Sequence, residues 1–471
     1  MPPEIDLRDV RRGSVMAPAG CGKTQLIADT LGQHAASKPV LVLTHTNAGV
    51  AALRKRLRAL GVPQAAFQVG TIDGFAMQLV ARFPTRSGID PQHLKLIQPR
   101  TDYPALREGA RRILQERHLH SSLCATYAGV IVDEYQDCNA VQHAIIAWLA
   151  EDLPTCVFGD PMQAIFGFRG NTLVDWTADV LPYFPAVGQL ETPWRWVNAG
   201  TGDFGRWLLA ARETLAGGGA IDLRVAPPEV QWIRLDAATA DQQRIQAART
   251  AAPLPHGTVL VIGDSINATG RRQMASQTPG ATLVEKADLE DLTEFARTFT
   301  VDAADAAQRL IVFLADIMTN VGAAELVRRL DSLLRGTARN PPTTAETALL
   351  ALIRGPGYAT ALQAVIAVRE QPNVRVYRPE VLNAFTNALR VAQQGAQTFY
   401  EAALAERERG RHLGRLVTQR AVGSTLLLKG LEADVGVILY PERMDAKHLY
   451  VALTRGARRV VVCSHHPLIG A

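Results

Sequence analysis

Residues 128–142 read AGVIVDEYQDCNAVQ, a short apolar run followed at once by acidic and polar residues. Val130 to Val132 predict a short buried strand that ends at two adjacent carboxylates, Asp133 and Glu134, with a helix after them. Carboxylates at the end of a buried strand are costly unless a cation neutralises them, which favours a metal–triphosphate site. There Asp133 would hold Mg²⁺ and Glu134 would polarise the attacking water. The alternative is an exposed loop in which the acids only begin a helix.

A candidate phosphate-binding loop upstream favours the first interpretation. Residues 17–24 read APAGCGKT, which differs from the pattern GxxxxGK[ST] only at its first residue. Gly20 and Gly22 would let backbone N–H groups surround phosphate oxygens at the start of a helix. Lys23 would reach the β- and γ-phosphates, and Thr24 would ligate Mg²⁺. A chance glycine-rich turn between a strand and a helix is the alternative.

The composition is that of an ordinary folded protein, with 47% hydrophobic and 20% charged residues. A length of 471 residues predicts two to four domains. The net charge of +5 permits nucleic-acid binding but does not establish it. The five cysteines form no CxxC pair, so they indicate neither a zinc site nor a disulfide framework. With no apolar run long enough to span a bilayer, we expect a cytoplasmic protein with no membrane partner.

Strands and helices alternate along much of the chain. Residues 39–44 and 67–80 each give a strand or a strand–helix step, which argues for a parallel sheet with helices on both faces. Residues 82–127 predict a small helical insertion, whereas residues 256–265 predict a buried strand of a second sheet. The chain from about 286 to 415 is expected to be mostly helical before it returns to sheet.

A second set of polar residues follows the strand at 155–159, in the stretch TCVFGDPMQAIFGFRGN. Gln163 just past this strand is placed to bridge a γ-phosphate to whatever lies above the sheet. Phe166 and Phe168 beside Arg169 could stack unpaired bases, although core packing is the alternative for at least one of them.

The stretch LETPWRW (190–196) places Arg195 between two tryptophans. An arginine among bulky aromatic residues calls for a partner, and a phosphate or a cation–π contact would supply one.

Together these stretches resemble the UvrD/Rep family of superfamily 1 helicases. The matching blocks, in the family's order, are APAGCGKT, LVLTHTNAGVAALRKRL, VGTIDGFA, VIVDEYQD, VFGDPMQAIFGFRGN, LETPWRW, LLLKGLEADVGVILY and KHLYVALTRGARRVVV. The resemblance implies an α/β protein with two RecA-like P-loop NTPase domains, a small helical insertion in the first and a larger, mostly helical insertion in the second. The expected segments are domain 1A at 1–190 with a reduced 1B-like insertion at 82–127, the first part of domain 2A at 191–285, a 2B-like insertion at 286–415 and the remainder of domain 2A at 416–471.

The resemblance also implies ATP and Mg²⁺ as cofactors and assigns roles to individual residues. The expected catalytic residues are Glu134, Gln163, Arg195 and Arg455, the two arginines acting as arginine fingers. The expected nucleotide-binding residues are Ala19, Gly20, Cys21, Gly22, Lys23, Thr24, Trp194 at the place of an adenine-stacking tyrosine, and Glu432. The expected metal ligands are Thr24 and Asp133, and the expected DNA contacts are Thr46, Asn47, Phe166, Phe168 and Arg169.

The chain departs from the family at several places. Residues 1–22 contain no glutamine to read adenine, which puts base selectivity in question. His45 replaces a strand-contacting phenylalanine, Asp73 replaces a histidine, and Leu426 replaces a DNA-contacting histidine. The ATP chemistry is therefore expected to be intact and the grip on DNA altered.

Three functions follow as hypotheses. The first is an ATP-dependent translocase or helicase on single-stranded or partly duplex DNA, moving 3′ to 5′ if polarity follows the family. The second is a DNA-sensing ATPase subunit that regulates a partner nuclease, similar to the short helicase-like subunit of the Gabija antiviral system. The third is a non-catalytic helicase-fold scaffold, which the complete set of candidate ATP residues disfavours.

Overall fold

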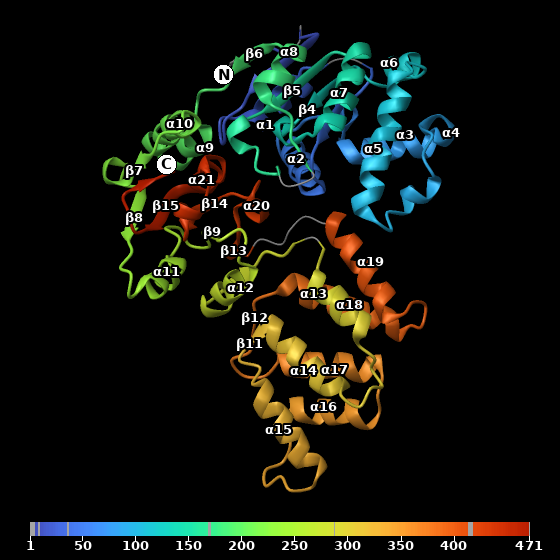
Figure 1. The fold of residues 1–471 in the computed structure, drawn as a ribbon, viewed down its shortest axis with the longest axis vertical. Coiled ribbons are helices and arrows are strands. Elements are labelled where there is room, and N and C mark those ends of the chain that lie inside the picture. The colour runs from blue at the N-terminus through green and yellow to red at the C-terminus, as the bar shows by residue number, and fades with distance from the viewer. Residues whose placement is uncertain are drawn as a thin grey trace. The chain divides into compact units, whose positions relative to one another are not determined.

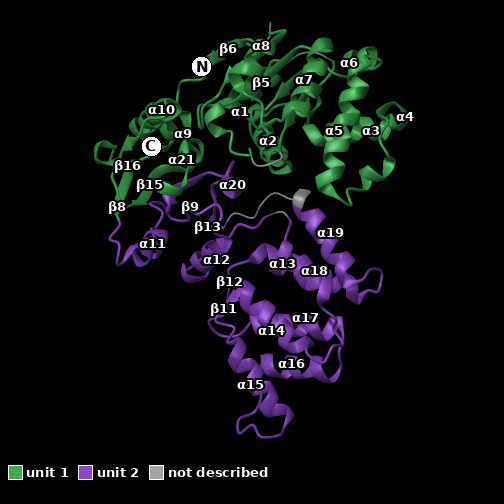
Figure 2. Ribbon diagram, in the orientation of Figure 1, with its two compact units in different colours: residues 1–234, 441–471 green, residues 235–440 purple. Residues whose placement is uncertain are grey.

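The computed structural model describes residues 5–7, 10–34, 37–167, 171–286, 288–412 and 418–470, the side chains of 411 and 412 excepted. The chain divides into two compact units, drawn in different colours in Figure 2. Unit 1 contains residues 1–234 and 441–471, and unit 2 contains residues 235–440. Figure 1 draws the chain coloured from its N-terminus to its C-terminus, with many of its elements labelled.

Unit 1 contains a six-stranded sheet with the strand order β3-β2-β4-β5-β1-β6. Its strands are β1 (Arg12–Met16), β2 (Val40–Thr44), β3 (Phe67–Thr71), β4 (Gly129–Val132), β5 (Thr155–Gly159) and β6 (Ala186–Gln189). All neighbouring strands of this sheet are parallel. The segments that follow β1 to β5 therefore leave the sheet at one edge, where ligands bind in open α/β sheets.

Strand β2 shows why this sheet is covered on both faces. Its sequence VLVLT is buried at every position. Val40 and Val42 belong to one apolar cluster, and Leu41 and Leu43 belong to another, because successive side chains point to opposite faces. The helices that contribute to the first cluster are α1 (Lys23–Gly32) and α2 (Asn47–Ala59). The helices that contribute most to the second are α3 (Ile72–Arg82), α5 (Pro99–Gln115) and α7 (Ala140–Asp152).

The segment between α3 and β4 is helical, as expected for the small insertion. It contains α4 (Pro84–Ser87), α5 and α6 (His120–Thr126). Residues 83–128 are all described and contain no strand. Helix α5 packs on α3 and α7 through Leu106, Ala110 and Ile113. The insertion is therefore joined to the first sheet through two of the helices that cover it.

The second sheet has the strand order β10-β13-β9-β14-β15-β8. Its strands are β8 (Val230–Arg234), β9 (Val259–Gly263), β10 (Ala281–Leu283), β13 (Arg420–Ser424), β14 (Ala433–Ile438) and β15 (Gly456–Ser464). The pairs β10/β13, β13/β9, β9/β14 and β15/β8 are parallel. The helices of unit 1 that follow β6 or precede β15 are α9 (Trp194–Ala199), α10 (Gly202–Ala216) and α21 (Ala446–Leu453).

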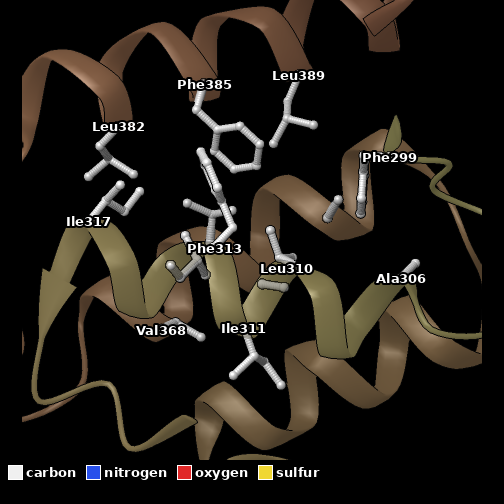
Figure 3. Packing of buried hydrophobic residues seen from close by; sticks show 14 of the residues in the cluster. Phe299, Ala306, Leu310, Ile311, Phe313, Ile317, Val368, Leu382, Phe385 and Leu389 are labelled. Carbon is white, nitrogen blue, oxygen red and sulfur yellow. The ribbon is translucent and has the colours of Figure 1, made fainter. Parts of the chain in front are cut away.

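Most of unit 2 is a helical insertion between β10 and β13. Its helices are α13 (Glu290–Thr298), α14 (Ala306–Ile317), α15 (Ala323–Leu334), α16 (Thr344–Arg354), α17 (Tyr358–Arg369), α18 (Pro379–Gln393) and α19 (Phe399–His412). Figure 3 shows Phe385 of α18 beside Phe313 of α14, and their ring centroids lie 4.9 Å apart. This part of unit 2 therefore has an apolar core of its own.

The predicted fold class is confirmed: two parallel α/β sheets flanked by helices, with a small helical insertion in the first half and a larger one in the second. The expected domain boundaries at 190, 285 and 415 stay a prediction. Among the described residues, no helix is both long enough and apolar enough to cross a membrane.

Candidate active site

The candidate nucleotide-binding and catalytic residues of the first sheet follow several of its strands at the same edge. The candidate phosphate loop connects β1 to α1, and Asp133 and Glu134 follow β4 directly. Gln163 ends the short helix after β5. This arrangement results from parallel strand order alone, because every strand's carboxyl end lies on one side.

The loop has the backbone that its glycines predict. Gly20 and Gly22 have φ angles of 71° and 89°, in the left-handed region where a side chain is disfavoured. Gly22 is the N-cap of α1, and Lys23 is the first residue of that helix, as expected. The backbone N–H groups at such a helix start, together with its dipole, favour an anion.

Lys23 joins the loop to the two carboxylates. Its ammonium nitrogen lies 2.6 Å from Oδ1 of Asp133 and also forms an ion pair with Glu134. Burial works against the ammonium, but the attraction of Asp133 and Glu134 is stronger and raises the pKa of Lys23 above its ordinary value. The expected loop lysine and the expected acidic pair are therefore brought together in one cluster.

A hydrogen-bond network connects this cluster to the residues that follow β5. Gln136 donates from Nε2 to Oε2 of Glu134 at 2.7 Å, and its Oε1 accepts from the backbone N–H of Asp160 at 3.2 Å. The Asp160 carboxylate in turn accepts from Nε2 of Gln163 at 2.9 Å. Asp160 is also bound by Arg212 of α10, whose Nε and Nη2 lie 3.0 and 2.7 Å from Oδ1.

Arg195 lies beside the phosphate loop. Its backbone N–H donates to the carbonyl of Gly20 at 3.0 Å, and its Nη1 donates to the carbonyl of Thr454 at 2.8 Å. Its guanidinium also lies over the ring of Trp196, 5.2 Å from the centroid, so the cation–π partner suggested by the sequence is present. The loop, Arg195 and the segment before Arg455 are thus held together within unit 1.

Helix α21 supplies a further contact to the same loop. The hydroxyl of Tyr450 accepts from the backbone N–H of Ala19 at 3.2 Å. Arg455, which follows the helix, is 3% exposed and donates from Nε to the carbonyl of Val451 at 2.8 Å. Its Nη2 donates to the hydroxyl of Thr454 at 3.0 Å. Arg455 therefore lies next to the residue that Arg195 binds.

The remaining nucleotide-binding candidates have different positions. A Cβ atom added to Gly22 would lie 3.0 Å from Cδ1 of Trp194, so this indole lies directly against the loop. Cys21 is buried within the loop, and Thr24 is partly exposed on the first turn of α1. Glu432 is exposed in unit 2, next to the start of β14.

These residues fit ATP with Mg²⁺. A lysine cation already lies between the two carboxylates, so the acidic pair is arranged to receive positive charge. The loop's left-handed glycines leave no room for side chains: a Cβ atom on Gly20 would lie 2.6 Å from Cζ3 of Trp196. Among the described residues, no group of three or more histidine, cysteine and acidic side chains is arranged to hold a metal ion.

The candidate DNA contacts follow β2 and β5. Thr46 is the N-cap of α2 and accepts from the N–H of Gly49 at 3.0 Å, and Asn47 begins that helix. The ring of Phe166 is 6.3 Å from that of His45, so the segments that follow β2 and β5 approach each other through two aromatic side chains. Phe166 is half-buried. The predictions for Phe168 and Arg169 lie outside the described residues.

Sequence reasoning did not single out Gln136, Asp160, Arg212 or Tyr450 as site residues. Gln136, Asp160 and Tyr450 lie inside the quoted motif blocks. The sequence indicates Arg212 less directly: this residue lies four positions after the buried Leu208, on the apolar face of α10. A charge on that face requires a buried partner, which is Asp160.

A comparison with protein families finds a match in the part of the chain that contains the phosphate loop and the acidic pair. The family model of the UvrD/REP helicase N-terminal domain matches residues 11–101 and 92–175. The resemblance to UvrD-like superfamily 1 helicases is therefore confirmed over residues 11–175. The more particular resemblance to a Gabija subunit stays a prediction.

Two further comparisons concern the whole chain. A crystal structure of Pif1 helicase from Candida albicans is similar over 97% of this chain and 92% of that chain, with 10% sequence identity and a TM-score of 0.41. No curated protein matches the chain.

Proposed function

We propose that this chain is an ATP-driven translocase or helicase on single-stranded DNA that moves 3′ to 5′. One observation carries the proposal: the cluster of Lys23, Asp133 and Glu134 shares a compact unit with Arg195, which binds the phosphate loop at Gly20. The UvrD/REP domain match over residues 11–175 supports the same class of activity.

The residues divide the chemistry as follows. Bound ATP with Mg²⁺ would supply the phosphoryl group that is transferred to water. The loop N–H groups and Lys23 would bind phosphate oxygens, while Thr24 and Asp133 would hold the metal. Glu134 would orient the attacking water and accept its proton, and Gln136 fixes the Glu134 carboxylate through the hydrogen bond to Oε2.

Positive charge near the phosphates has the greatest effect in the transition state. Arg195 and Arg455 would stabilise charge that develops on the transferred group, a contribution that can reach about 10³-fold or more in phosphoryl transfer. Gln163, held by Asp160, would report the presence of the terminal phosphate to the loop that carries Phe166.

A second candidate, a DNA-sensing ATPase that regulates a nuclease, is favoured by the contacts of Asp73. Its carboxylate accepts from Arg107 and Gln142, and at this position the resemblance leads one to expect a histidine. Because the Asp73 carboxylate is paired with Arg107 inside the protein, this position offers no cation to a DNA phosphate, while ATP hydrolysis would stay intact.

Two measurements on the same preparation test both candidates. ATP hydrolysis is measured with and without a single-stranded oligonucleotide, and strand separation is measured on duplexes with a 3′ or a 5′ tail. The helicase proposal expects stimulated hydrolysis and unwinding of the 3′-tailed duplex only. Stimulated hydrolysis without unwinding would support the regulatory ATPase, and no hydrolysis under any of these conditions would contradict both.

A further inference from the structure

Asp73, in the first turn of α3, is held by side chains from two other helices. Arg107 of α5 donates from Nε and Nη2 to the two carboxylate oxygens, at 2.7 and 2.6 Å. Gln142 of α7 donates from Nε2 to Oδ1 at 2.9 Å. Burial alone would lower the pKa of Arg107, but the hydrogen bonds and the charge of Asp73 raise it above its ordinary value. The helical insertion is thus bound to the sheet's covering helices by a bidentate ion pair.

Gln142 uses both ends of its amide. While Nε2 serves Asp73, Oε1 accepts from the backbone N–H of Asn139 at 3.1 Å. Asn139 completes a capping box, because its Oδ1 accepts from the N–H of Gln142 at 3.0 Å. Gln142 is 2% exposed, so its amide has no water to replace a lost partner. Loss of Asp73 would leave a buried donor unsatisfied and weaken the cap of α7.

Asn139 in turn supports the segment that carries Phe166. Its Nδ2 lies 3.4 Å from Oδ1 of Asn171, and its backbone forms an isolated β-bridge with Leu173. Asn171 then donates from Nδ2 to the carbonyl of Phe166 at 3.0 Å. Phe166 faces His45, where the candidate nucleic-acid contacts lie.

We propose that Asp73 and Arg107 are positioning residues: through Gln142, Asn139 and Asn171 they fix Phe166, so that helix α5 of the insertion sets how strongly a single strand stimulates hydrolysis. The expected effect on DNA-stimulated hydrolysis rests on the proposed function. The hydrogen bonds from Asp73 to Phe166 are present in the protein without DNA. The side-chain hydrogen bonds of Asp73 and Arg107 join them to each other and to Gln142, and none of these bonds involves the phosphate loop or the acidic pair, so hydrolysis without DNA is expected to be unaffected.

The activity test uses Asp73→Ala and Arg107→Ala in the full chain with a single-stranded thymidine oligonucleotide. Each variant is expected to raise the oligonucleotide concentration for half-maximal stimulation about tenfold, on the order of one lost charge-assisted hydrogen bond. Basal hydrolysis and the KM for ATP are expected to change less than about twofold, since the site residues keep their contacts.

The matched control breaks another bidentate pair on the same helix. Glu108 of α5 accepts from Nε and Nη2 of Arg111 at 2.9 and 2.5 Å, but this pair is more exposed and makes no bond to α3 or α7. Glu108→Gln is therefore expected to leave both the basal and the stimulated rates unchanged. An equal effect of Glu108→Gln and Asp73→Ala would overturn the inference.

A second readout does not depend on DNA. Hydrogen–deuterium exchange of the peptide that spans residues 139–143 is expected to accelerate in Asp73→Ala and in Arg107→Ala, while the peptide of β5 keeps its protection. Unchanged exchange together with unchanged stimulation would overturn the inference, as would a parallel loss of basal and stimulated hydrolysis, which indicates general destabilisation. If the wild-type chain hydrolyses no ATP, the proposed function fails, and the exchange experiment still decides whether the connection exists.

Discussion

The ammonium of Lys23 lies 2.6 Å from a carboxylate oxygen of Asp133, and the same ammonium also contacts Glu134. One cation therefore stands between two acids that follow a buried strand directly. The side chains are 17%, 13% and 29% exposed, so water screens these charges only in part. Charge balance at this point depends on Lys23, and a ligand that brings its own cation would compete for the same carboxylates.

Replacement of Lys23 by alanine is expected to abolish ATP turnover. The variant loses the cation that binds phosphate oxygens, and it leaves Asp133 and Glu134 without the ion pair that opposes their mutual repulsion. We expect kcat to fall at least about 100-fold, the scale of removing one transition-state donor. Steady-state hydrolysis assays measure this directly.

Lys38→Ala is a suitable control for that experiment. Lys38 is exposed and donates to the carbonyl of Cys124, away from the phosphate loop. The Lys38→Ala variant is expected to hydrolyse ATP at the wild-type rate. A Lys23→Ala variant as active as Lys38→Ala would show that the loop is not the hydrolytic site.

For Arg455→Ala we expect lost turnover with nucleotide binding largely kept. An arginine finger acts on charge that develops in the transition state, so its removal lowers kcat more than affinity. The side chain also bonds the carbonyl of Val451 at the end of α21, so thermal unfolding should be measured alongside. Binding of a fluorescent ATP analogue separates the two quantities.

Arg458→Ala provides the comparison for Arg455. Arg458 lies three residues further on, in β15, and donates to the carbonyl of Ala199 at 3.0 Å. Its loss is expected to leave turnover near the wild-type value. If Arg455→Ala weakens nucleotide binding as much as it slows turnover, the transition-state role is wrong.

Local sequence was sufficient to predict the strand ends that build the site. The strand VLVLT is apolar at every position but its last, Thr44, and polar residues follow it. Because the sheet is parallel, the residues after β1, β4 and β5 had to meet at one edge. The cluster of Lys23 with Asp133 and Glu134 follows from that rule together with the loop motif.

Contacts between distant segments could not be predicted in the same way. The bond of Tyr450 to Ala19 joins residues 431 positions apart, and no periodicity encodes it. Asp73 was recognised only as a departure from a family pattern, whereas its partners Arg107 and Gln142 depend on how α5 packs on α3 and α7. Packing geometry, rather than local propensity, decides such contacts.

Arg212→Met is expected to destabilise the protein and to slow turnover. Arg212 and Asp160 are 7% and 1% exposed as side chains, so the variant leaves a buried carboxylate without its cation. Breaking such a pair from one side costs about 3–5 kcal/mol. Asp160 also orients Gln163, so a disturbed carboxylate is expected to lower kcat as well. Denaturant unfolding and steady-state hydrolysis measure the two effects.

A double variant separates charge from packing in that pair. Asp160→Asn combined with Arg212→Met removes both charges, and most of the lost stability is expected to return because no unpaired ion remains buried. The amide that replaces the Asp160 carboxylate accepts a weaker hydrogen bond from Gln163 than the carboxylate does, so hydrolysis is expected to stay impaired. If the double variant is less stable than the sum of the two single changes, the buried pair is not the source of the loss.

Gly20→Ala tests whether the contact between the phosphate loop and Arg195 matters for turnover. Gly20 has a φ of 71°, and an added Cβ would lie 2.9 Å from Cβ of Arg195. Gly61 offers a matched control, because its φ is 73° and nothing lies within 4 Å of an added Cβ. Left-handed strain of about 1–2 kcal/mol is common to both alanine variants. Only Gly20→Ala should displace Arg195 and Trp196, whose Cζ3 lies 2.6 Å from the added Cβ, so only this variant is expected to lose hydrolysis beyond what its lower stability explains. Equal rates for the two variants at matched folded fractions would show that Arg195 need not lie against Gly20 for the reaction to proceed.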